Sequence, residues 1–372
     1  MKILIFYAAY GGGHLSAAKS IKQYIDDHYK DAETEMVDCI KYINKDIDKL
    51  TTLAYKEMAK NAPWAWGKIY NQSQHGAMAH ISNGANKLMS IKLHKLFDEF
   101  NPDIVISTHP FGSQMTAYLK RKGKTNCILA SVMTDFASHD QWLVGNEQID
   151  YFFVSHEGMK KDISKKGIDE SKIFATGIPL SNRFLKHFNR EEIKKSFDLD
   201  LNKKTILFFG GGEFGLGKSA TINILNAFIN DLGNEYQLIA ISGKNEKMRH
   251  AFEETVGNNP NVQVYGYTNE VPELMSISDL VVTKPGGLTI SESLASGLPI
   301  VIINPIPGQE VENAEFLERA GVAVWIRKTE KPDEVVSDLL SNPKQIEHMK
   351  IRSKLMAKRY STRNICKKLL EG

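Results

Sequence analysis

An imidazole comes directly after a glycine cluster near the start of the chain, where His14 follows Gly11, Gly12 and Gly13. A short apolar run precedes the cluster and a helical pattern follows it, so we expect His14 in the first turn of a helix. A helix N-terminus disfavours the protonated ring, which keeps a neutral imidazole available as a base near neutral pH. We therefore predict that His14 is a general base. The alternative is a side chain that only hydrogen-bonds the glycine loop.

Two more polar side chains follow predicted strands in the same half of the chain. His109 lies in the segment Ser107-Thr-His-Pro, and Asp135 lies in Met133-Thr-Asp-Phe. A carboxylate at such a position can orient an imidazole and stabilise its charge. We predict His14, His109 and Asp135 as catalytic residues, with Asp135 either the partner of His14 or the base itself.

A second glycine cluster follows an apolar run in the middle of the chain. Gly210, Gly212 and Gly215 have the spacing G-x-G-x-x-G, in which the backbone can approach a phosphate closely and the following helix directs free N–H groups at it. The next apolar run ends at Ile241-Ser-Gly-Lys, without the acidic residue with which an NAD site binds the ribose. This disfavours an NAD enzyme and favours a nucleotide held mainly by its phosphates. A purely structural tight turn is the alternative.

A third segment, TKPGGLTISE, also follows an apolar run and leads into a helical pattern from Gly287 onward. Thr289 and Glu292 have the spacing of a capping box, in which Glu292 only returns a hydrogen bond to the start of the helix. The competing role is a carboxylate that accepts both hydroxyls of a ribose. Further on, Gln309 and Glu310 are expected at the start of another helix, where an amide beside a carboxylate suits the vicinal hydroxyls of a sugar.

Strand-like apolar runs alternate with helical patterns along both halves of the chain and would position these residues. Continuous apolar runs are typical of parallel strands that are buried on both faces. The predicted strands are Ile3–Ala8, Ile104–Ser107, Ile128–Met133, Tyr151–Val154, Ile206–Phe209, Gln237–Ile241, Leu280–Val282 and Ile300–Ile303. The pattern predicts an α/β chain with two Rossmann-like, doubly wound parallel-sheet domains that face an interdomain cleft.

A glycine and proline turn at Gly177-Ile-Pro-Leu, followed by a charged segment that reaches Asp200, marks the expected domain junction. We place one domain at residues 1–185, a second at 186–345, and a C-terminal helix at 346–372 that by analogy returns to the first domain. The segment Ile40–Ser90 fits the alternation poorly and carries Trp64 and Trp66. We expect it to be an inserted, partly helical excursion.

The composition is that of an ordinary globular protein, with 372 residues, 42% of them hydrophobic and 24% charged. No apolar stretch approaches the roughly 20 residues that span a bilayer, and the first apolar run is too short for a secretory leader, so we expect a cytoplasmic protein. The three cysteines, Cys39, Cys127 and Cys366, are far apart and have no spacing for zinc or a dithiol. We predict no metal site.

The net charge of +3 is too small for a surface that tracks nucleic acid, so no nucleic-acid partner is expected. The C-terminal part of the chain is nevertheless locally basic. Between residues 344 and 368 it carries, against Glu347 alone, the side chains of Lys350, Arg352, Lys354, Lys358, Arg359, Arg363, Lys367 and Lys368. A solvated helix face explains this pattern, and attraction to anionic lipid headgroups is the alternative.

Together these motifs resemble the monogalactosyldiacylglycerol synthase and processive diacylglycerol glucosyltransferase group of glycosyltransferase family 28, and more distantly the N-acetylglucosaminyltransferase that makes lipid II. The resemblance covers nearly the whole chain, through GGGHLSAAKSI, PDIVISTHP, TDFASHDQW, ATGIPLSNRF, FFGGGEFGLGK and TKPGGLTISESLASGLPIVIINPIPGQEVENAEFL. It implies a GT-B architecture, with the UDP-sugar held mostly by the domain at 186–345. The domain at 1–185 would face the membrane and bind the acceptor.

The resemblance also implies roles for individual residues. The donor would be bound by Gly12, Gly13, Gly211, Gly212, Phe214, Gly287, Leu288, Thr289, Glu292, Gln309 and Glu310. Within this set, the diphosphate would lie near Gly211, Gly212 and Phe214, the uridine ribose on Glu292, and the hexose on Gln309 and Glu310. Ser181 stands where relatives often carry an Arg that contacts a phosphate, and Arg183 comes two residues later.

The implied activity is an inverting transfer of glucose or galactose from a UDP-hexose to a diacylglycerol-type lipid, which forms a β-glycosyl glycolipid without a metal or another cofactor. An anionic membrane surface is then an expected partner, with the protein peripheral on the inner face of the cell membrane. Two alternatives stay open at this point. One is an isomerase similar to UDP-sugar 2-epimerases, and the other is a non-catalytic protein that senses UDP-sugar.

Overall fold

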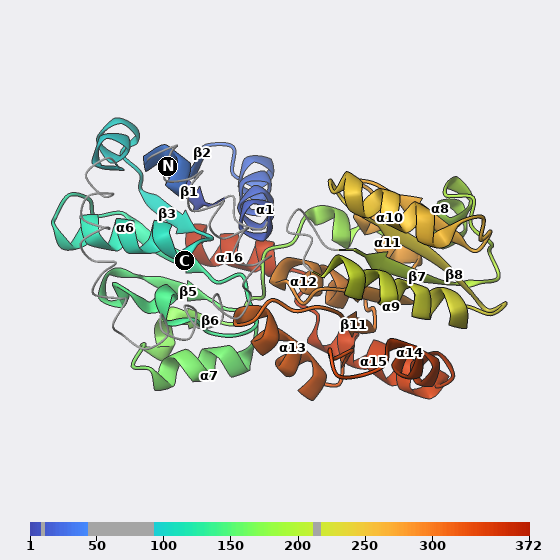
Figure 1. Cartoon of the computed structure of the whole chain (residues 1–372). Coiled ribbons are helices and arrows are strands. Elements are labelled where there is room, and N and C mark those ends of the chain that lie inside the picture. Colours follow the sequence, from blue (N-terminus) through green and yellow to red (C-terminus); the bar gives the residue numbers. More distant parts are fainter. Residues whose placement is uncertain (9–11, 44–92, 211–216) are drawn as a thin grey trace. The chain divides into compact units, whose positions relative to one another are not determined.

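The computed structural model describes residues 1–8, 12–43, 93–210 and 217–372, which form two compact units (Figure 1). The N-terminal unit holds the described residues up to Asn182 together with Lys358–Gly372, and the C-terminal unit holds Arg183–Ala357. Gly211, Gly212 and Phe214, and the predicted excursion from residue 44 onward, lie outside the described residues.

Six parallel strands form the sheet of the N-terminal unit, in the order β2-β1-β3-β4-β5-β6. The strands are β1 (Lys2–Tyr7), β2 (Glu33–Asp38), β3 (Ile104–Ser107), β4 (Ile128–Val132), β5 (Tyr151–Phe153) and β6 (Ile173–Phe174). The helices of this unit are α1 (Gly13–His28), α2 (Cys39–Ile43), α6 (Pro110–Arg121), α7 (Glu157–Lys165) and α16 (Ser361–Leu370), with short 3-10 helices η1 (Asp140–Leu143), η2 (Asn146–Gln148) and η3 (Glu170–Lys172). The 3-10 helix η4 (Asn182–Leu185) begins at Asn182 of this unit and continues into residues of the C-terminal unit. Residues 93–100 are also helical.

Alternate residues of the central strands enter two apolar cores, because successive side chains of a strand point to opposite faces. Leu4 and Phe6 of β1 pack in the core that α6 and α7 cover, whereas Ile3 and Ile5 pack in the core that α1 and α16 cover. Trp142 is buried in the first of these cores.

The last helix of the chain is fixed to the N-terminal unit by polar contacts as well as by its apolar face. Thr362 Oγ1 accepts the N–H of Leu180 at 2.9 Å and donates to the Leu180 carbonyl at 2.7 Å. At the other end of α16, the hydroxyl of Tyr29 donates to Glu371 Oε1 at 2.7 Å. The preceding helix, α15 (Pro343–Met356), belongs to the C-terminal unit.

The C-terminal unit contains a second six-stranded parallel sheet, in the order β12-β11-β10-β7-β8-β9. Its strands are β7 (Lys204–Phe209), β8 (Tyr236–Ile241), β9 (Val262–Tyr265), β10 (Leu280–Thr283), β11 (Ile300–Ile302) and β12 (Ala323–Trp325). Its remaining helices are α8 (Arg190–Ser196), α9 (Lys218–Asp231), α10 (Glu246–Val256), α11 (Val271–Ile277), α12 (Gly287–Ala295), α13 (Gln309–Arg319) and α14 (Pro332–Leu340). The predicted fold class, two doubly wound parallel sheets with alternating helices, is therefore confirmed.

Each sheet has a point at which the strand order reverses. In the N-terminal unit it lies between β1 and β3, and in the C-terminal unit it lies between β7 and β10. Open α/β sheets bind their ligands outside the carboxyl ends of the strands at such a point. The segments that the sequence singled out, after β1, β3, β7 and β10, all begin there.

The sequence prediction missed four strands, and these are the four edge strands β2, β6, β9 and β12. Central strands are covered on both faces and read as continuous apolar runs, whereas strands at an edge need less apolar cover. In β2 the exposed residues Glu33 and Glu35 alternate with partly or fully buried ones. No continuous apolar run therefore marks the edges in the sequence.

Candidate functional site

His14 lies in the first turn of α1, as predicted. The helix is preceded by Gly12, whose φ of 75° is left-handed and suits a glycine. The ring nitrogen Nδ1 of His14 lies 2.6 Å from the carbonyl oxygen of Thr108 and 3.0 Å from the hydroxyl of Thr134. The His14 side chain, from the first turn of α1, therefore contacts the segments that follow β3 and β4.

These contacts determine which nitrogen of His14 carries the proton. A carbonyl oxygen only accepts hydrogen bonds, so Nδ1 must carry the hydrogen that it donates to Thr108. Thr108 returns a bond, because its hydroxyl donates to the backbone carbonyl of His14 at 2.9 Å. In the neutral ring, Nε2 is then left with a free lone pair, which is the form that a general base needs.

Burial keeps this imidazole neutral. The pKa of His14 falls from 6.5 to about 4 because the charged ring would lose its hydration, although the bond to Thr108 opposes the change. His109 lies beside it, with ring centroids 4.7 Å apart in an edge-to-face arrangement. The pKa of His109 is also lowered by burial and, to a smaller extent, by the charge that His14 would carry.

Three histidines cap helices in this unit in the same way. Nδ1 of His109 accepts the N–H of Phe111 at 3.3 Å at the start of α6, and Nδ1 of His139 accepts that of Gln141 at 3.1 Å at the start of η1. His156 does so for Met159 at the start of α7. Because an acceptor nitrogen has no proton, all three rings are neutral with the proton on Nε2.

Burial stabilises the same neutral state of these capping rings. It lowers the pKa of His139 to about 4 and also lowers the pKa of His156. The proton on Nε2 of His156 is donated to the carbonyl of Phe136 at 2.9 Å. The sequence analysis missed His156, although a histidine directly before a helical pattern and after an apolar run is a usable signal.

Asp135 comes directly after Thr134, which touches His14. The two contacts at Nδ1 of His14 are made by Thr108 and Thr134, neither of which the sequence singled out. Both are polar residues that follow a strand, which is the signal that would have found them. The role of Asp135, as partner or as base, stays a prediction.

In the C-terminal unit, α12 begins directly after a loop at the end of β10. Its N-cap is Gly286, which offers no side chain to the free N–H groups of the first turn, those of Gly287, Leu288 and Thr289. The amide of Asn313 holds the loop by donating to the Pro285 carbonyl at 3.0 Å. The start of α12 can therefore bind an anion through its backbone.

The capping box that the sequence offered as an alternative for Glu292 is not formed. Thr289 is already the third residue of α12, so it does not stand at the N-cap, and Glu292 lies in the second turn. Among the residues that the structure describes, none hydrogen-bonds the Glu292 carboxyl. Burial raises its pKa to about 8. A half-buried carboxyl with free oxygens is suited to accept two vicinal hydroxyls.

Gln309 and Glu310 begin α13, as predicted. Oε2 of Glu310 accepts the N–H of Ile306 at 2.7 Å, which fixes the carboxyl against the preceding loop. Burial raises the pKa of Glu310, while the positive charge of Lys284 and the Ile306 hydrogen bond oppose that change. Lys284 was not singled out by the sequence analysis, although a lysine between a strand and a glycine pair is a recognisable signal.

Arg183 makes a two-pronged ion pair with Glu273, at 2.6 and 2.7 Å, and donates to the carbonyl of Asn269 at 2.6 Å. These contacts lie within the C-terminal unit and give Arg183 a structural role there. Among the described residues, no group of three acidic, histidine or cysteine side chains is arranged to hold a metal ion. The helices within the described ranges include none with the length and apolarity to cross a bilayer.

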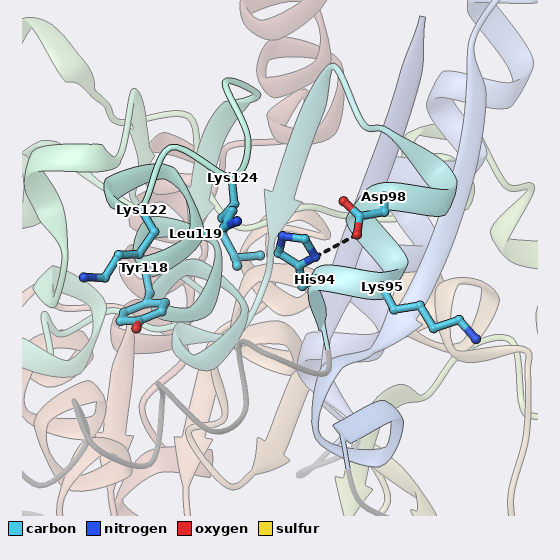
Figure 2. Close-up of a pocket in the computed structure, with 7 residues that line it drawn as sticks. All are labelled: His94, Lys95, Asp98, Tyr118, Leu119, Lys122 and Lys124. Carbon is cyan, nitrogen blue, oxygen red and sulfur yellow. Dashed lines mark ion pairs between the residues drawn. The ribbon is translucent and has the colours of Figure 1, made fainter.

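A surface cavity of about 530 Å³ opens between the helical residues 93–100 and the C-terminal end of α6 (Figure 2). It is lined by His94, Lys95, Asp98, Tyr118, Leu119, Lys122 and Lys124, and a His94–Asp98 ion pair of 2.7 Å lies at its wall. None of the predicted site residues lines it. His109 caps the opposite end of α6, which at 1.5 Å per residue is about 18 Å away. This cavity is therefore distinct from the histidine cluster.

Known proteins resemble the chain along its whole length. Residues 14–180 match the family described as monogalactosyldiacylglycerol synthase, and residues 205–365 match the glycosyltransferase family 28 C-terminal domain. A processive diacylglycerol beta-glucosyltransferase of Staphylococcus epidermidis is 31% identical over 386 residues, which cover 100% of this chain and 92% of the relative.

Two solved structures show the same fold at low sequence identity. MurG of Acinetobacter baumannii matches with a TM-score of 0.66 at 13% identity and 100% coverage of both chains. The UDP-GlcNAc 2-epimerase of Neisseria meningitidis, bound to UDP-GlcNAc, matches with a TM-score of 0.64 at 14% identity, also over the full length of both. At such identities the likeness concerns the fold alone, so these two structures do not distinguish a transferase from an epimerase. The relative that is similar in sequence does distinguish them, because it is a glucosyltransferase.

Proposed function

The chain belongs to the monogalactosyldiacylglycerol synthase and processive diacylglycerol glucosyltransferase group of glycosyltransferase family 28, and on that premise we propose that it is an inverting UDP-hexose transferase with a GT-B fold. Its acceptor is a diacylglycerol-type lipid and its product is a β-glycosyl glycolipid. The relative from Staphylococcus epidermidis is a beta-glucosyltransferase, which favours glucose over galactose as the transferred sugar.

The C-terminal unit binds the donor in this proposal. The Glu292 carboxyl accepts the two ribose hydroxyls, and the free N–H groups at the start of α12 bind the diphosphate. Gln309 and Glu310 contact hydroxyls of the hexose. The support for these roles is that the carboxyl of Glu292 has no hydrogen-bonding partner in the described part of the chain and that α12 has no side-chain cap.

The N-terminal unit supplies the base. The acceptor hydroxyl attacks the anomeric carbon, the bond from that carbon to the β-phosphate oxygen breaks, and the bonding electrons leave with UDP. Nε2 of His14 takes the proton of the attacking hydroxyl. The observation that carries the proposal is the fixed tautomer of His14, because the bond from Nδ1 to Thr108 leaves Nε2 as the basic nitrogen.

We expect this reaction to need no metal ion. UDP gains negative charge as the bond breaks, and backbone N–H groups at helix starts can stabilise that charge in a site that excludes water. The start of α12 supplies such groups. The start of α9 is similar, because its N-cap Gly217 makes no side-chain cap and its first turn has no acidic residue.

We propose that the enzyme works at a membrane surface, because its proposed acceptor is a lipid, and features of α15 support this location. Ile351 and Leu355 stand one turn apart on this helix and are 49% and 80% exposed. The exposed side chains of Lys344 and Lys354 flank them. An apolar stripe between lysines is suited to the boundary between anionic headgroups and acyl chains.

Incubation with UDP-glucose or UDP-galactose, labelled in the sugar, and diacylglycerol vesicles tests the activity. We expect label in the lipid extract, with one donor clearly preferred. Recovery of a different sugar nucleotide and no labelled lipid would instead identify an epimerase. If the label stays in the unaltered donor, both with UDP-glucose and with UDP-galactose, the transferase assignment is overturned.

A further inference from the structure

We propose that Lys284 binds the β-phosphate of the sugar nucleotide and stabilises UDP as it leaves, an inference that rests on the proposed function. This lysine directly follows β10 and stands two residues before Gly286, the N-cap of α12. It therefore belongs to the loop that presents free backbone N–H groups at the point where the strand order reverses. Charge and backbone donors occur together on one short segment.

The ammonium group of Lys284 is not paired in the described part of the chain. No ion pair or hydrogen bond joins its Nζ to another described residue, although most of the side chain lies inside the unit. A buried ammonium costs free energy unless it is paired or hydrogen-bonded, and it offers three donors. Burial lowers the pKa of Lys284, and only the Glu310 carboxylate opposes that change. A bound anion would stabilise this charge.

The proposed roles of these groups follow the order of groups in a sugar nucleotide. Glu292, proposed for the ribose, lies in the second turn of α12, and the free N–H groups lie in its first turn. Lys284 comes next, and its charge acts on Glu310, which is proposed for the hexose. The phosphate that bears the hexose is the β-phosphate. Lys284 is therefore the cation next to the bond that breaks.

Glu310 makes the cation necessary. The charges of Lys284 and Glu310 act on each other, so without Lys284 the Glu310 carboxylate would lose the positive charge that offsets its repulsion of the phosphate. Removal of Lys284 would thus lose an attraction and leave a repulsion. The competing role of Lys284 is purely structural, as a counter-charge for Glu310, and it predicts no difference between ligands with and without phosphates.

Calorimetric titration of the full chain with uridine, UMP and UDP separates these roles. For Lys284→Met we expect affinity for UDP to fall about 10- to 100-fold, UMP to lose less, and uridine to bind as in the unaltered protein. Lys284→Arg should restore most of the UDP affinity because it keeps the charge. Lys247→Met, at an exposed lysine of α10 in the same unit, is the matched control and should bind UDP normally.

Glu310→Gln adds a second test, because removal of the repelling carboxylate should recover part of the UDP affinity of Lys284→Met. Equal losses for uridine and UDP in Lys284→Met, or no loss for either, would overturn the phosphate role. If the unaltered protein takes up no UDP, the proposed function itself is wrong, and the inference about Lys284 is lost with it. A folded Lys284→Arg that binds UDP as poorly as Lys284→Met would also contradict the charge argument.

Discussion

The rings of His14 and His109 meet edge to face, with centroids 4.7 Å apart and planes inclined by 80°. His109 is buried and His14 is half-buried, burial lowers the pKa of both, and a positive charge on His14 lowers the pKa of His109 further. The two rings therefore resist carrying protons at the same time. His109 therefore does not readily take up the proton that His14 accepts during the reaction. That proton must leave the two rings before the next turnover.

Replacement of the proposed base is the first prediction. His14→Ala should lower turnover about 10²- to 10⁴-fold, because general-base assistance has that magnitude. UDP affinity should stay nearly unchanged, since most of the proposed donor contacts lie in the C-terminal unit and the two in the N-terminal unit, Gly12 and Gly13, are backbone contacts. Steady-state kinetics with vesicles and calorimetry with UDP measure the two quantities.

His28→Gln is the matched control, because His28 lies in the last turn of the same helix and bonds only the Tyr24 carbonyl among the contacts described for it, at 2.9 Å. Its turnover should be that of the unaltered enzyme. Full turnover in a folded His14→Ala variant would remove His14 from the mechanism and leave Asp135 as the candidate base.

Acid should destabilise the protein through its buried histidines. The pKa of His139 is 6.5 when the chain is unfolded and about 4 when folded, so the unfolded state binds more protons between these values and stability falls as pH falls. From pH 6.5 to pH 5, one such group costs about 2 kcal/mol. His14 and His156 add to the effect in the same direction.

His139→Asn isolates this effect, because the Asn oxygen can accept the N–H of Gln141 as Nδ1 does but does not titrate. The loss of unfolding free energy between pH 6.5 and pH 5 should be about 2 kcal/mol smaller in this variant, while His250→Asn, at an exposed histidine, should behave as the unaltered chain. Denaturant titrations at the two pH values give the comparison. An identical acid loss in His139→Asn would refute the assignment.

Binding of UDP should release a proton from Glu292. With a pKa of about 8 this carboxyl is mostly protonated at pH 7 in the free protein, and ribose hydroxyls that donate to it favour the ionised form. Affinity for UDP should therefore rise between pH 6 and pH 8. Calorimetry in buffers of different ionisation enthalpy counts the protons released.

Glu292→Gln should bind both uridine and UDP more weakly and should release fewer protons than the unaltered protein. Protons released by the phosphates of UDP contribute equally to both counts, so subtracting the count for Glu292→Gln from the count for the unaltered protein leaves the contribution of Glu292. The same proton count in both would show that Glu292 does not meet the ribose.

The apolar stripe on α15 should matter for vesicles and not for chemistry. The double variant Ile351→Ser and Leu355→Ser should bind anionic vesicles at least about tenfold more weakly, because each apolar side chain contributes roughly 1.5 kcal/mol or more when buried. Activity on a short-chain, water-soluble diacylglycerol should stay unchanged. Tyr267→Ser, at a residue of the same unit that is 62% exposed, is the control. Undiminished sedimentation of the double variant with vesicles would exclude α15 as the docking surface.

The sequence predicted the central strands and the positions of His14, Gln309 and Glu310 at helix starts, because apolar runs and glycine clusters are local signals. It missed the edge strands, such as β2, whose exposed glutamates interrupt the apolar pattern. It also missed Thr108, Thr134 and Lys284. Their roles arise when loops from separate strands meet, as the contacts of Thr108 and Thr134 with His14 show, and no local pattern encodes such a meeting.

The central claim is an inverting transfer from a UDP-hexose to a lipid hydroxyl, and the configuration of the product tests it most directly. UDP-hexose labelled with ¹³C in the sugar, diacylglycerol vesicles and a metal chelator are incubated with the enzyme, and the anomeric proton of the extracted lipid is read by NMR. We predict a β-glycosyl lipid, recognised by the large diaxial coupling of that proton, and one UDP released for each sugar transferred. An α-linked lipid, or an epimerised sugar nucleotide without any glycolipid, would contradict this account.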